Sequence, residues 1–116
     1  DNNASEEIIV DEEKDISITI KGDYYVKHES SFNIVNRLGS NIFPNDIKFD
    51  KSNETKVTSF KLNRGLYKLK CIDTYGDGGM EGFIKQGENT LLAFNWNNLD
   101  WKENNGYLKY YEFEVL

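Results

Sequence analysis

The sequence predicts an all-β fold, an antiparallel β-sandwich of about seven or eight strands with a jelly-roll-like arrangement. Apolar and polar residues alternate with a period of two over several short segments. Turn-forming residues separate these segments at intervals of about 8–12 residues. No segment combines a helical period with caps at both ends. The chain is expected to comprise an N-terminal linker or arm, residues 1–14, and one sandwich domain, residues 15–116.

The strands are expected to follow one another along the chain, separated by turns. Ile16–Ile20 alternates strictly, as a half-buried strand does. Residues 96–106, which carry Trp96 and Trp101, are expected to form a polar loop before the last strand. The other expected strands are a short edge strand at 8–10, then 31–37, a short strand within 42–50, 55–62, 66–72, a hairpin of 82–85 with 90–95, and 107–115.

The strand at 66–72 indicates which of its faces lies in the core. Tyr67, Leu69 and Cys71 share one face, and lysines occupy the other. Cys71 is the only cysteine, so the chain can form neither an intramolecular disulfide nor a cysteine-based zinc site. We expect Cys71 to be a small buried apolar residue rather than a nucleophile.

The charge balance favours one class of partner and argues against two others. The chain has 14 Lys and Arg against 20 Asp and Glu, a net charge of −6. This excess of carboxylates argues against binding to nucleic acid and to anionic membranes. No segment approaches the ~20 apolar residues of a membrane span. Divalent cations are the natural partners of carboxylates that converge on one point.

The strongest local signal is the glycine-rich stretch from Asp73 to Gly79. Its glycines allow tight turns, and Asp73 and Asp77 supply the oxygen ligands that Ca²⁺ prefers. It is not an EF-hand, because Ile84 stands where that motif requires a bidentate Glu. The alternative is a glycine-rich turn in which both aspartates accept hydrogen bonds from backbone amides.

Two elements of the sequence together resemble an ancillary domain of large secreted proteins. The first is Asp23-x-Tyr25-x-x-x-Glu29-x-Ser31-Phe32, and the second runs from Gly65-x-Tyr67 to Asp73-Thr-Tyr75-Gly-Asp-Gly78. The resemblance spans residues 16–115. The sequence lacks the family's proline in the first element, has Phe32 in place of Trp, and has Gly79-Met80 where cysteines often follow. The resemblance implies a secreted or surface-attached, non-catalytic β-sandwich appended to peptidases, glycosidases or adhesins.

The two elements also predict a metal site. Asp23 and Glu29 lie in one inter-strand connection, and Asp73 and Asp77 in another. If the two connections meet at one end of the sandwich, four carboxylates repel one another until a cation binds. We expect Ca²⁺ held by these four side chains, with backbone carbonyls of Tyr75 or Gly79 completing the shell. Whether Asp23 binds the metal or caps a turn stays open.

Aromatic and acidic residues elsewhere allow alternative functions. Trp96, Trp101 and Tyr107, among several asparagines, could bind an extracellular polysaccharide, although packing of a tryptophan into the core is the simpler interpretation. A small enzyme using Glu29 with Asp73 or Asp77 is a third hypothesis, which His28 does not support because no nucleophile matches it. We expect a non-catalytic, secreted or cell-surface accessory domain that binds an extracellular polymer or a neighbouring domain; a purely structural spacer is the alternative.

Overall fold

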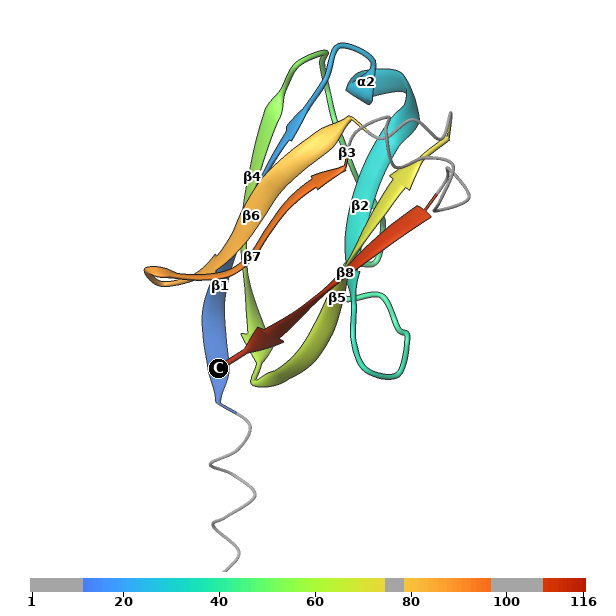
Figure 1. The fold of residues 1–116 in the computed structure, drawn as a ribbon. Helices are drawn as coiled ribbons and strands as arrows, with labels where there is room; N and C mark the ends of the chain where they lie inside the picture. Colours follow the sequence, from blue (N-terminus) through green and yellow to red (C-terminus); the bar gives the residue numbers. More distant parts are fainter. Residues whose placement is uncertain (1–11, 75–78, 97–107) are drawn as a thin grey trace, which may run out of the picture.

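The computed structural model describes residues 12–74, 79–96 and 108–116. Two four-stranded antiparallel sheets lie face to face (Figure 1), one in the order β4-β1-β6-β7 and the other in the order β3-β2-β5-β8. This confirms the predicted all-β sandwich; the helical turn α2 was not predicted. The elements are β1 (Glu13–Gly22), α2 (Val26–Glu29), β2 (Ser30–Val35), β3 (Ile47–Lys48), β4 (Thr55–Asn63), β5 (Gly65–Asp73), β6 (Met80–Gln86), β7 (Asn89–Trp96) and β8 (Leu108–Val115).

Strand β1 forms the centre of the first sheet, as its strict alternation predicts. Ile18 lies opposite Thr58 of β4 on one side and Ile84 of β6 on the other. The three isoleucines of β1 point to the core and are almost completely buried. The strand begins at Glu13, two residues before the expected domain boundary, because Glu13 and Lys14 already pair with β4. The edge strand expected at 8–10 lies outside the described residues.

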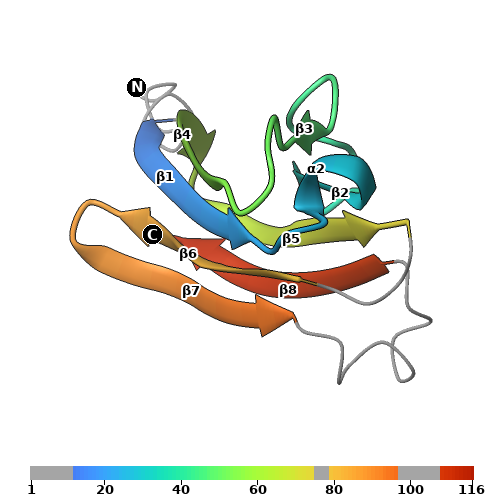
Figure 2. The same cartoon turned by 90° about the horizontal axis from the view of Figure 1, so that it is seen from above.

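The core fills the space between the sheets and is closed at both edges by aromatic pairs. Ring centroids of Phe94 and Tyr111 are 5.1 Å apart where β7 runs beside β8 (Figure 2), and those of Phe43 and Phe60 are 5.1 Å apart at the other edge. Leu69 and Cys71 of β5 are fully buried, as predicted. The other buried apolar residues include Ile34, Phe32, Leu62, Met80, Ile84, Trp96, Phe113 and Val115.

Asn33 is a buried polar residue of β2 that fixes the following connection. Its side-chain amide donates hydrogen bonds to the carbonyl of Phe43 (3.1 Å) and to Asp46 (2.9 Å), and its oxygen accepts one from the amide of Phe43 (3.1 Å). The side chain has no exposed surface. These bonds hold residues 43–46 against β2.

The sandwich has two poles that differ in chemistry. The connections β1–β2 and β5–β6 meet at the first pole, which we call the acidic pole, with α2 beside it (Figure 1). The opposite pole, the turn pole, holds the single-residue connection at Arg64 between β4 and β5 and the two-residue turn between β6 and β7. Strand β1 begins and β8 ends at the turn pole, where Leu116 exchanges hydrogen bonds with the Gln86 side chain.

Candidate functional site

The sheet register brings two acidic residues together at the acidic pole. Ser30 of β2 is the antiparallel partner of Asp73 of β5, and the amide of Thr74 donates a 2.8 Å hydrogen bond to the carbonyl of Glu29. Glu29 is 5% exposed and Asp73 is 0% exposed. Two acidic residues that are distant in the sequence therefore lie on neighbouring backbone positions of β2 and β5, and both are buried.

The single helical turn α2 forms because Asp23 organises the chain before it. The Asp23 carboxylate accepts a 2.9 Å hydrogen bond from the amide of Tyr25, and its carbonyl accepts bonds from Val26 (3.3 Å) and Asn53 (2.9 Å). Val26 then packs into the core directly over Gly22, where any Cβ would lie 2.2 Å from the valine side chain. Asp23 thus caps a turn, one of the two roles left open by the sequence.

Gly79 connects this turn to the neighbouring strands. Its carbonyl accepts a 2.9 Å hydrogen bond from the amide of Asp23, and its own amide donates one of 2.7 Å to the carbonyl of Trp96. Its φ of +95° is unfavourable for residues with a side chain. A Cβ there would lie 2.4 Å from Oδ2 of Asp23. The carbonyl expected to bind the metal therefore also accepts a hydrogen bond within the protein.

The structure thus brings three of the four predicted carboxylate residues to one pole. Asp23, Glu29 and Asp73 lie on the two connections that meet there. Asp77 and Tyr75 lie outside the described residues. Among residues 12–74, 79–96 and 108–116, no three Asp, Glu, His or Cys side chains are grouped closely enough to hold a metal ion by themselves.

Two buried polar atoms at this pole lack a hydrogen-bond partner among the residues that the structure describes. They are the Ser30 hydroxyl and Nε1 of the fully buried Trp96. Burying such a group without a partner costs about 1–3 kcal/mol. Ser30 was not predicted as a site residue, although its spacing from Phe32 and Ile34 places it on the inward face of β2.

A hollow of about 510 Å³ opens at this pole beside Asp23, Gly79 and Trp96. Its lining includes both charged and amide side chains: Lys21, Asp23, Glu81, Asn53 and Asn95. Trp96 borders it, but the indole is fully buried and presents no free face for a sugar ring. The prediction of Trp96 as a sugar-binding residue is therefore wrong, because it ends β7 and packs into the core rather than lying in a polar loop. Trp101 and Tyr107 lie outside the described residues.

Cys71 has the character of a packing residue. It is fully buried in β5, and burial raises the pKa of its thiol far above the ordinary value, because the charged thiolate is poorly solvated there. The reactive thiolate is thus disfavoured at neutral pH, as expected for an inert core cysteine.

Comparisons of the chain with family models, with curated proteins and with solved structures found no match. In the part of the chain that the structure describes, no helix has the length and apolar character needed to cross a membrane.

Proposed function

We propose that this chain is a non-catalytic accessory domain of a larger secreted or cell-surface protein, and that Ca²⁺ fastens its acidic pole. The observation that carries the proposal is the burial of Glu29 and Asp73 at one pole, on either side of Ser30. Ser30 follows Glu29 in the chain and pairs with Asp73 across the two strands, and among the described residues its hydroxyl has no hydrogen-bond partner.

The groups present fit a hard cation. Carboxylate and hydroxyl oxygens are the donors that Ca²⁺ takes, six to eight at a time and in variable geometry. A cation is attracted to acidic residues that lie at one pole, because its positive charge offsets their mutual repulsion. Glu29, Asp73 and Ser30 would hold the ion, with Asp77 and the carbonyl of Tyr75 as the further ligands that the sequence predicts. Mg²⁺ fits less well, because it keeps its waters and demands a strict octahedron.

The ion would supply a crosslink between two connections that are distant in the sequence. The protein's own contribution is to place the ligands: β2 and β5 set the separation of Ser30 and Asp73, and the turn at Asp23 sets the entry of α2. Asp23 is a positioning residue in this proposal. A pole made rigid by the ion could contact a neighbouring domain or an extracellular polymer. The alternative is that the whole domain is a purely structural spacer.

Thermal unfolding of the whole chain in EGTA and in CaCl₂ tests the proposal. A ligand that binds only the folded state at 100 times its Kd stabilises it by about 2.7 kcal/mol, which raises Tm by roughly 10 °C in a domain of this size. The Ser30→Ala variant should keep its Tm in EGTA, because it loses no hydrogen bond, and should gain less from calcium. Glu88→Gln, which removes a carboxylate at the turn pole, is the matched control and should respond like wild type. A Tm that calcium does not change would contradict the proposal.

A further inference from the structure

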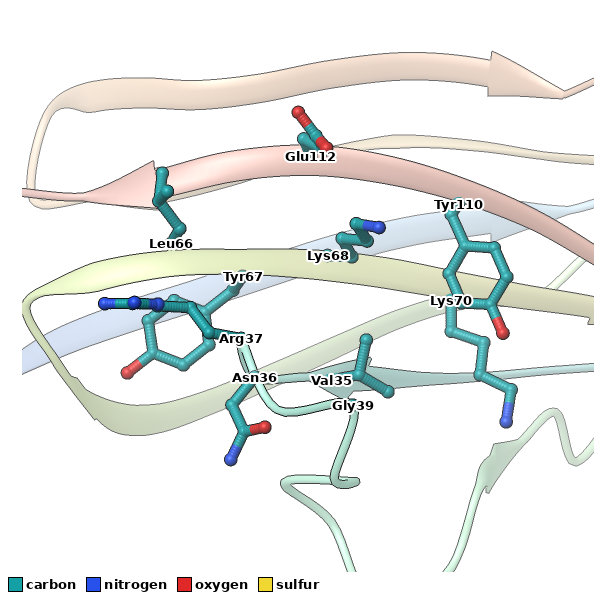
Figure 3. Close-up of a pocket in the computed structure, with 10 residues that line it drawn as sticks. All are labelled: Val35, Asn36, Arg37, Gly39, Leu66, Tyr67, Lys68, Lys70, Tyr110 and Glu112. Atoms are coloured by element: carbon teal, nitrogen blue, oxygen red, sulfur yellow. The ribbon is translucent and has the colours of Figure 1, made fainter.

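A groove on the outer face of the second sheet gathers positive charge. It has a volume of about 490 Å³ and extends from the turn pole along β5 and β8, beside the turn that follows β2 (Figure 3). The β5 side chains that line it include those on the face of the strand that does not pack in the core. The lining residues used below are Val35, Arg37, Leu66, Lys68, Lys70 and Tyr110. We call this surface the basic groove.

The basic groove concentrates cations in a chain whose net charge is −6. Among the described residues that line it, Arg37, Lys68 and Lys70 face a single acidic residue, Glu112. The side chains of Arg37 and Lys70 lie at opposite ends of the groove (Figure 3), so positive charge extends along it. The ion pairs found in the described part of the chain are made by lysines outside the groove. An anionic partner therefore fits this surface.

The basic groove continues into a second hollow of about 340 Å³ at the turn pole. The two hollows share Arg37, Leu66 and Tyr67, and the second adds Arg64 and Leu38. Both arginines of the chain therefore border one continuous surface.

Strand β5 has an open edge along this surface. Pairing of β5 with β2 ends at Lys68, whereas pairing with β8 continues to Gly65. In the described part of the chain, residues 65–67 of β5 therefore have a strand neighbour on one side only. Residues 36–40 turn away after β2, because the backbone amide of Asn36 and its side-chain oxygen both bond to the backbone of Ser40. The second hollow thus lies where a longer β2 would continue.

Apolar surface lies among the cations. Leu38 is 88% exposed, Leu66 is 56% exposed and Tyr110 is 47% exposed, with the Lys68 ammonium 5.9 Å from the centroid of the tyrosine ring. A polyuronate offers carboxylates but neither apolar side chains nor backbone amides. An acidic peptide offers all three, and an extended peptide can add to an open strand edge. The surface therefore favours a peptide over a polysaccharide.

We propose that the basic groove binds an extended acidic segment of a partner polypeptide, which adds to β5 at residues 65–67. Alternate residues of a strand face the same side. An apolar side chain opposite Leu66 would therefore be flanked by acidic ones, within reach of Arg64 at one end and of Arg37 and Lys68 at the other. Backbone hydrogen bonds along β5 supply affinity, and the cations select a partner of negative charge. This site lies away from the acidic pole and does not rest on the calcium proposal.

An NMR titration of the full chain with the peptide Ac-Glu-Thr-Leu-Thr-Glu-NH2 tests this proposal. The amide signals of residues 65–67 should shift most, and that of Val57 on the other sheet should not move. The double variant Arg37→Glu/Lys68→Glu should weaken binding about tenfold, because each substitution turns an attraction into a repulsion. The peptide Ac-Lys-Thr-Leu-Thr-Lys-NH2 should bind this variant more tightly than it binds wild type.

Two controls separate strand addition at this groove from general attraction between charges. The variant Lys51→Glu/Lys85→Glu changes the net charge equally but outside the groove, and it should bind the acidic peptide like wild type. The acidic peptide N-methylated at its leucine and both threonines keeps its charge but loses those backbone donors, so it should bind at least tenfold more weakly.

Four results would overturn the proposal. They are no shift at residues 65–67, equal loss of binding in the two double variants, equal affinity for the methylated and unmethylated peptides, and a response to alginate alone. In the last case alginate would shift the amides of Lys68 and Tyr110 while the peptide shifts neither, which would assign the basic groove to a polyuronate instead.

Discussion

Substitution of Gly79 by alanine tests the packing of the acidic pole. Gly79 has a φ of +95°, and a Cβ there would lie 2.4 Å from Oδ2 and 2.7 Å from Cγ of Asp23. Alanine in this backbone region costs about 1–2 kcal/mol. Moving the Asp23 carboxylate also loses its exposed hydrogen bond to the amide of Tyr25, worth about 1 kcal/mol. We expect Gly79→Ala to destabilise the fold by about 2–3 kcal/mol.

Gly39 provides the matched control, because its φ is +85° and nothing lies within 4 Å of a Cβ there. Gly39→Ala should therefore show only the backbone cost. Urea denaturation followed by circular dichroism measures both variants. In an Asp23→Ala background, Gly79→Ala should lose about 1 kcal/mol of its effect, because the contact is gone. Equal losses for Gly79→Ala and Gly39→Ala, with additivity in the double variant, would refute the reasoning.

Three further predictions concern the core and the surface. Asn33→Ala should destabilise the fold by about 2–4 kcal/mol in urea denaturation, because it leaves the buried amide and carbonyl of Phe43 without partners; an effect below 1 kcal/mol would contradict this. Cys71 should react with a thiol reagent only as fast as the protein unfolds, so rapid labelling under native conditions would disprove its burial. The hydrogen bond from Lys56 lowers the pKa of Asp50 below its ordinary value of 3.8, so its stabilisation is present above that pH and is lost as the pH falls through the lowered pKa. The difference in Tm between wild type and Asp50→Asn should therefore narrow below pH 3.8, and a constant difference would contradict this assignment.

The sandwich was predictable because alternation is a local property. The isoleucines of β1 and the Leu69–Cys71 face of β5 indicate their inward faces without any knowledge of their neighbours. The helical turn α2 was not predictable from periodicity, because a single turn has no period to detect. It depends instead on hydrogen bonds to Asp23 and on the space that Gly22 leaves for Val26.

The candidate site was predictable in part. The proximity of Glu29 and Asp73 was anticipated from their places on two connections. The Ser30 hydroxyl was not, because a serine before Phe32 is equally typical of a turn. The buried amide of Asn33 was missed for another reason: its partners at 43–46 belong to a connection whose path the sequence pattern does not specify. The sequence predicts Trp96 at the start of a polar loop, whereas its register opposite Met80 places it at the end of a strand.

Strand β1 starts and β8 stops at the same end of the molecule, and the acidic connections lie at the other. Any polypeptide attached through either end would join the sandwich at the turn pole and leave the acidic pole, in which Glu29 and Asp73 are buried, at the far end. A pulling force applied between the two attachment points would act on β1 of the first sheet and β8 of the second sheet at the turn pole. The acidic pole would not bear this force. In a tandem array of such domains, each acidic pole would point away from the axis along which the domains are linked.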